Sequence, residues 1–97
     1  MDRLSAMALL VKVTELGSMS AAARALNMPL TTVSRHIGEL ESALGVRLLA
    51  RTTRKLTLTD AGVDYVAAAR RILEEVENAE RQATGEYQEP KGELVIS

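Results

Sequence analysis

The chain has 97 residues, of which 46% are apolar, and this length and composition predict one small domain with one modest core. It has no cysteine and one histidine, His36, so we expect neither a disulfide scaffold nor a zinc finger. The formal net charge is −1, but residues 24–55 hold six basic and two acidic residues, whereas residues 56–97 hold four basic and nine acidic residues. A local positive patch of this kind, rather than the net charge, decides whether phosphate groups are attracted.

Apolar residues at helical spacing predict three consecutive helices. Their ends follow from Gly17 and Gly45, which suit helix C-caps, and from Ser18, which suits an N-cap. The expected helices cover residues 4–16, 19–26 and 29–44. The expected buried stripe of the first helix consists of Leu4, Met7, Ala8 and Val11. Asn27 and Met28 form a tight turn between the second and third helices, so the second and third helices have the spacing of a helix-turn-helix.

The third helix has two different faces. Its buried stripe is expected to consist of Val33, Ile37, Leu40 and Leu44. The opposite face carries Thr31, Ser34, Arg35 and Gly38, at positions i, i+3, i+4 and i+7. This second face is polar, small and basic. A helix with such a face fits the major groove of DNA, where hydroxyl groups reach phosphates or bases and arginine reads guanine.

Two short strands are expected after the third helix, over residues 47–49 and 55–58. The polar and basic residues 50–54 lie between them, so the two strands and this loop form a β-hairpin. Because the hairpin directly follows the third helix, we expect its basic loop to lie against the minor groove or the backbone of the same DNA.

A long helix is expected over residues 60–83, with Thr59 as its N-cap and Gly85 after its end. Its apolar residues repeat at heptad spacing, which predicts a dimerisation seam made of Tyr65, Ala69, Ile72, Leu73, Val76, Ala79 and Ala83. At about 1.5 Å per residue the helix is about 35 Å long, which is too long for so small a domain to cover. We expect its first half to pack on its own domain and its second half to pack on a second copy.

The chain carries an ordered series of motifs: GSMSAAARAL at 17–26, VSRHI at 33–37, LE at 40–41, LGVRLL at 44–49, Arg51 and LTDAG at 58–62. This series covers nearly the whole chain and resembles the LysR-type transcriptional regulators. The resemblance implies a mainly α fold, in which a winged helix-turn-helix of three helices and a two-stranded β-wing is followed by a long dimerising linker helix. It also implies a bacterial regulator that is dimeric or tetrameric.

The resemblance divides the chain into a winged DNA-binding domain (residues 1–59), a linker and dimerisation helix (60–84), and a hinge with the start of an effector-binding domain (85–97). Residues 93–97 have the pattern of a strand, and a lone strand is not stable, so we expect a larger domain to follow. The expected partners are a dyad-symmetric duplex operator and a second copy of the chain. A small-molecule effector is expected to bind only the following domain, and neither a cofactor nor a metal is expected.

The residues assigned to DNA contact are Ser18, Ser20, Pro29, Leu30, Thr31, Thr32, Ser34, Arg35, His36, Arg51, Thr53 and Arg54. Two positions depart from the family's pattern. Pro29 and Leu30 stand where Ser-Gln is common, and Leu30 cannot read adenine as an amide does, although it can touch a thymine methyl group. Gly38 stands where a longer polar or basic side chain is common, which removes one phosphate contact.

An enzyme is not expected, because His36 has no cysteine or cluster of acidic residues around it. The alternative to DNA binding is a protein-docking module whose working surface is the long helix. The cluster of Arg35, Arg51 and Arg54 favours DNA over this alternative. No apolar run approaches membrane-spanning length and no signal peptide opens the chain, so we expect a soluble cytoplasmic protein.

Overall fold

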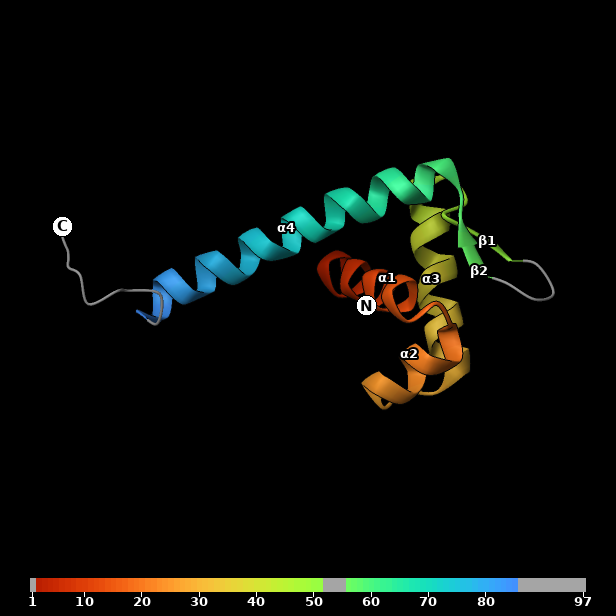
Figure 1. Ribbon diagram of the computed structural model, residues 1–97, viewed down its shortest axis with the longest axis horizontal. Coiled ribbons are helices and arrows are strands. Elements are labelled where there is room, and N and C mark those ends of the chain that lie inside the picture. The colour runs from red at the N-terminus through yellow and green to blue at the C-terminus, as the bar shows by residue number, and fades with distance from the viewer. Residues whose placement is uncertain (1, 52–55, 86–97) are drawn as a thin grey trace.

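The computed structural model describes residues 2–51 and 56–85 of the chain. Over these residues the elements are, in order, α1 (Arg3–Leu16), α2 (Met19–Leu26), α3 (Leu30–Leu44), β1 (Leu49–Arg51), β2 (Leu56–Leu58) and α4 (Asp60–Thr84). The first three helices and the hairpin gather at one end of the molecule, and α4 extends away from them (Figure 1). This arrangement confirms the predicted mainly α, winged helix-turn-helix architecture with a long helix after it.

Side-chain caps fix the helix boundaries close to where the sequence places them. The hydroxyl oxygen of Ser18 accepts a hydrogen bond from the N–H of Ala21 at 3.1 Å, which caps α2. Asn27 ends α2 in the left-handed conformation with φ at 56°, which makes the tight turn before α3. The predicted third helix begins at Pro29. In the structure Pro29 has an extended ψ of 145° and is the N-cap, so α3 begins one residue later, at Leu30.

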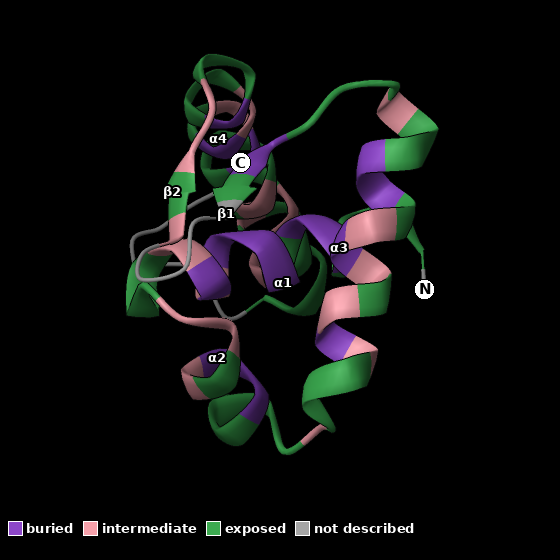
Figure 2. Cartoon of the chain, turned by 90° about the vertical axis from the view of Figure 1, so that its right-hand side faces the viewer, coloured by how far each residue is buried: buried purple, intermediate pink, exposed green. Residues whose placement is uncertain are grey.

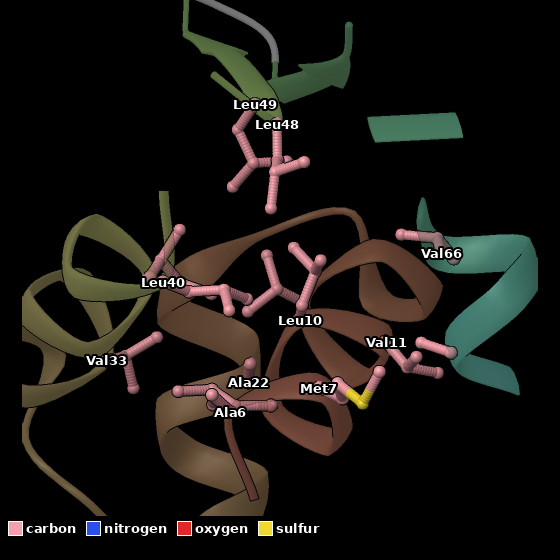
Figure 3. Close-up of a cluster of buried hydrophobic side chains, with 14 of the residues drawn as sticks. Ala6, Met7, Leu10, Val11, Ala22, Val33, Leu40, Leu48, Leu49 and Val66 are labelled. Atoms are coloured by element: carbon pink, nitrogen blue, oxygen red, sulfur yellow. The ribbon is translucent and has the colours of Figure 1, made fainter. Parts of the chain in front are cut away.

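The core is arranged around α1, which contacts α2, α3 and α4. Figure 3 shows side chains from all four helices and from the start of the hairpin meeting near Leu10 of α1, which is fully buried. The buried residues of α1 are Ala6, Met7, Leu9, Leu10, Val11 and Val13. The predicted single stripe is therefore wrong, since Leu4 is 40% exposed and Ala8 is also exposed. A helix packed on three sides has no one-sided apolar pattern.

Small side chains bring α2 close to the core. Ala22 is fully buried and Ala23 is nearly so, and α2 contacts both α1 and α3. A methyl-sized side chain adds little thickness between two helices, so their backbones can approach closely. The consequence is a compact α2–α3 pair whose turn and whose N-terminal end of α3 project away from the core (Figure 2).

The hairpin is antiparallel, with Leu49 opposite Leu58 and Arg51 opposite Leu56. The predicted first strand, 47–49, begins two residues too early. The N–H of Leu48 donates to the Glu41 carboxylate at 2.8 Å and is therefore not available to the neighbouring strand. Its carbonyl still accepts from the N–H of Thr59 at 3.0 Å, in line with the register, but the Thr59 carbonyl accepts from Val63 at the start of α4, so the reciprocal strand bond is absent. Residues 52–55 of the predicted hairpin lie outside the described residues.

The first half of α4 packs on α1. Val66 and Ala69 are buried against the core, and the guanidinium of Arg70 lies 3.5 Å from the Glu15 carboxylate of α1. Thr59 caps the helix by accepting from the N–H of Gly62 at 3.0 Å. Farther along, Ile72, Ala79 and Ala83 are exposed. No helix in residues 2–51 and 56–85 has the length and apolar content needed to cross a membrane.

Alanine substitutions at two helical glycines should change the free energy of unfolding in opposite directions. A Cβ at Gly62 would lie 2.1 Å from the Leu48 carbonyl oxygen, so Gly62→Ala should lower the free energy of unfolding by about 3 kcal/mol. A Cβ at Gly38 would meet no atom within 4 Å, so Gly38→Ala should raise it by about 1 kcal/mol through helix propensity. Urea unfolding followed by circular dichroism measures both at one protein concentration. Two shifts of the same sign would contradict the close approach of α4 to Leu48.

Candidate nucleic-acid interface

Nine of the residues that the sequence assigns to DNA contact belong to α2, α3, their caps or the turn between them. Ser20, Pro29, Leu30, Thr31 and Arg35 are exposed. Ser18, Thr32, Ser34 and His36 are half-buried. Ser18 and Ser20 lie at the start of α2, and the other seven lie at the start or in the first half of α3. The N-terminal end of α3 is exposed (Figure 2). The structure therefore places these nine residues on the α2–α3 pair, whereas Arg51 lies in β1.

The two faces of α3 are as the sequence predicts. Val33, Ile37 and Leu40 are buried, and Leu44 is half-buried against the core. On the predicted polar face, Thr31 and Arg35 are exposed, whereas Ser34 and Gly38 are half-buried. Because the apolar stripe fixes how α3 sits on α1 and α2, the polar face is presented to solvent.

Two of the assigned side chains have local partners. The Ser18 oxygen is engaged in capping α2, as described above. The Nδ1 atom of His36 lies 3.4 Å from the Glu39 carboxylate, one turn along α3, and the His36 side chain is only 13% exposed. Both residues therefore have a structural task beside any contact with a ligand.

A surface hollow joins α2 and the start of α3. It has a volume of about 510 Å³ and is lined by Ser20, Ala23, Arg24, Asn27, Met28, Pro29 and Leu30. Its wall thus combines a hydroxyl, a guanidinium and the apolar side chain of Leu30, which is 46% exposed. A polar and cationic rim beside an apolar wall can accept a phosphate and an apolar base edge together.

Arg24 is the charged residue that lines this hollow, and the sequence did not assign it to DNA contact. It lies one helical turn after Ser20 on α2, and this i, i+4 spacing is the signal that could have found it. Arg24 and Arg35 are both exposed, and neither forms an ion pair within the part of the chain that the structure describes. Two unpaired guanidinium groups near one end of the molecule make that end electropositive.

Of the three hairpin residues assigned to DNA contact, only one belongs to the described part of the chain. Arg51 is the last residue of β1, whereas Thr53 and Arg54 lie outside the described residues. Among the described residues, no group of three or more His, Asp or Glu side chains is placed to hold a metal ion.

A helix-turn-helix with a polar, arginine-bearing second helix, followed by a β-hairpin, defines the class of winged helix-turn-helix proteins. The family model of bacterial regulatory helix-turn-helix proteins of the lysR family matches residues 4–63. The chain belongs to this family.

Curated relatives include an HTH-type transcriptional regulator of Xanthomonas campestris pv. campestris, which is 53% identical over 85 residues, or 87% of this chain and 24% of the relative. A transcriptional repressor of Pseudomonas aeruginosa is 44% identical over 96 residues, 99% of this chain and 30% of the relative. The transcriptional activator AaeR of Escherichia coli is 42% identical over 96 residues, 99% of this chain and 31% of the relative. The chain therefore spans less than a third of the length of these regulators.

Two similar solved structures are complexes with DNA. The DNA-binding domain of CbnR in complex with DNA matches with a TM-score of 0.81 and 32% identity, over 90% of this chain and all of that one (100%). The DNA-binding domain of BenM on catB site 1 DNA matches with a TM-score of 0.82 and 30% identity, over 87% of this chain and 92% of that one.

Proposed function

We propose that this chain is the DNA-binding part of a transcriptional regulator and that it places α3 in the major groove of a duplex operator. The observation that carries the proposal is the exposed end of α2 and α3, where Arg24 and Arg35 have no ion-pair partner in the described chain. The two similar domains that were solved with DNA support it.

Each assigned residue has a role that its chemistry suits. On α3, Arg35 reads guanine with its two-pronged guanidinium, and Leu30 touches a thymine methyl group. The remaining α3 and turn contacts are Pro29, Thr31, Thr32, Ser34 and His36. On α2, Ser18, Ser20 and Arg24 contact backbone phosphates. The hairpin contributes Arg51, Thr53 and Arg54, which face the minor groove or the adjacent phosphates.

Selection of bound duplexes from random DNA, with affinity measured across a salt series, tests the proposal. Each neutralised phosphate contributes about −0.9 to the slope of log K against log salt concentration, so a DNA-binding protein loses affinity steeply as salt rises. We expect an enriched, dyad-symmetric sequence and a steep slope. No enriched sequence, together with a flat salt response, would instead indicate the protein-docking module.

We further propose that α4 joins two copies of the chain. Exposed Ile72, Ala79 and Ala83 continue the heptad seam beyond Tyr65 and Ala69, which pack on the core. At about 1.5 Å per residue, the 25 residues of α4 span about 37 Å, and the outer half extends past the other helices (Figure 1). A second copy of α4 would cover this apolar line.

The whole regulator is proposed to have the further features that the family resemblance implies. These are a hinge and an effector-binding domain after residue 84, assembly into dimers or tetramers, and a place in the cytoplasm, where bacterial DNA lies. In this proposal a small-molecule effector acts through the following domain and the winged domain needs no cofactor. The greater length of the curated regulators is consistent with a further domain.

Ile72→Asp should yield monomers, because it places a charge in the proposed seam between two helices. Val63→Asp is the matched control. Val63 is 53% exposed against 40% for Ile72, and nine residues at about 100° each place the two side chains on opposite sides of α4. Sedimentation at micromolar concentration should show dimers for the wild type and for Val63→Asp. A monomeric wild type, or a dimeric Ile72→Asp variant, would contradict the seam.

Arg35→Ala and Arg24→Ala each remove one exposed positive charge, from α3 and α2 respectively, and should have different effects on DNA binding. Loss of the base-reading Arg35 should cost about 1–3 kcal/mol on the selected operator and relax the preference at one base pair of each half-site. Loss of Arg24 should weaken the operator and scrambled DNA equally and reduce the salt slope by about one unit. Affinities of both variants for both DNAs, at several salt concentrations, give the comparison. If Arg35→Ala weakens both DNAs by one factor, the base reading falls to Thr31, Thr32 and Ser34.

A further inference from the structure

Glu41 is the buried charged residue of the described chain, with 9% of its surface exposed. It lies in the last turn of α3, near the negative end of the helix dipole, where a carboxylate is disfavoured. Burial of a carboxylate is also costly unless hydrogen bonds compensate the charge. The helix dipole and the burial of the charge both disfavour a carboxylate at this position. We infer that the Glu41 side chain makes interactions that an apolar residue could not make.

The partners of Glu41 lie on the path into the hairpin. Its Oε2 atom accepts the N–H of Leu48 at 2.8 Å and the N–H of Leu49 at 3.1 Å, and it lies 3.7 Å from Nε of Arg47. Leu49 is the first residue of β1. A single carboxylate oxygen therefore connects the end of α3 to the beginning of the hairpin through two charge-assisted hydrogen bonds.

The opposite edge of the same segment is held by the start of α4. The Thr59 hydroxyl donates to the Arg47 carbonyl at 2.6 Å, and the Thr59 N–H donates to the Leu48 carbonyl at 3.0 Å. Gly62 allows this approach, since a Cβ there would collide with the Leu48 carbonyl. Residues 47–49 are thus held between α3, through the N–H groups of Leu48 and Leu49, and the N-cap of α4, through the carbonyl groups of Arg47 and Leu48. We call this three-residue segment the clamp segment.

The geometry assigns Glu41 as a positioning residue for DNA binding: its carboxylate fixes the hairpin and the start of α4 relative to α3. This inference rests on the proposed function, since DNA is the ligand that α3 and the hairpin must reach together. Glu41 does not touch DNA in this role. It sets the distance between two elements whose contacts must fit one duplex simultaneously, and a small shift of either element then weakens binding.

Glu41→Gln and its matched control Glu39→Gln distinguish the positioning of the hairpin by Glu41 from the general effect of removing a negative charge. Both remove one negative charge from α3, but Glu39 is exposed and its partner is His36 on the same helix. Removal of a negative charge near DNA alone strengthens binding. We therefore expect Glu39→Gln to bind the selected operator as tightly as the wild type or more tightly. Glu41→Gln keeps an acceptor oxygen but loses the charge that strengthens both hydrogen bonds, so it should bind about tenfold more weakly.

Glu41→Asp supplies the complementary variant, because it keeps the charge but shortens the side chain by one methylene group. It cannot reach the two N–H groups without movement of the backbone, so it should follow Glu41→Gln rather than the wild type. Amide hydrogen exchange by NMR reports on the clamp directly. Protection of the Leu48 and Leu49 amides should fall in both Glu41 variants and persist in Glu39→Gln.

All variants are compared at a temperature where circular dichroism shows wild-type helix content, so the measured Kd belongs to the folded protein. A residue that only stabilised the fold would lower Tm and leave this Kd unchanged, and that outcome overturns the inference. Equal affinities of Glu41→Gln and Glu39→Gln, or unchanged protection of Leu48 and Leu49, overturn it as well. A wild type that selects no duplex overturns the proposed function instead, whatever the exchange data show.

Discussion

The packing of three helices around α1 is the constraint on which the rest of the structure depends. The chain has no Phe or Trp, so the core consists of aliphatic side chains that fill space only when helices approach closely. Leu10 and Val13 of α1 and Ile37 of α3 are fully buried as a result. Because the apolar stripe of α3 packs in this core, the opposite, polar face of the helix is exposed to solvent.

The same packing explains which features of the fold the sequence could predict. Helix ends depend on local chemistry, so Ser18, Thr59 and the glycines after α1 and α3 place them within about a residue or two. The buried pattern of α1 depends on three partners that come later in the chain. Leu4 and Ala8 suit a one-sided helix but are exposed, because they lie on the side of α1 that α2, α3 and α4 leave uncovered.

The hairpin shows the same limit in its backbone. An apolar run of Leu48 and Leu49 predicts a strand, and Leu49 does begin one. Leu48 lies outside the strand because the side chain of Glu41, seven residues earlier, takes its N–H, although its carbonyl still pairs with the N–H of Thr59. No local pattern encodes a contact of that range. Likewise, the polar face of α3 could be predicted from its helical period, whereas the hollow that brings Arg24 beside Leu30 depends on the angle between two helices.

The charge distribution in space resolves the apparent conflict between an acidic chain and a nucleic-acid interface. The acidic residues of the last third are concentrated on α4, where Glu74, Glu75, Glu77 and Glu80 are all exposed. That helix runs away from the α2–α3 turn along a molecule 54 Å in its longest dimension (Figure 1). Charges in solution are screened beyond about 8–10 Å at physiological salt. The acid on the outer half of α4 therefore leaves the potential near Arg24 and Arg35 largely unchanged, and a duplex approaching that end meets a positive surface.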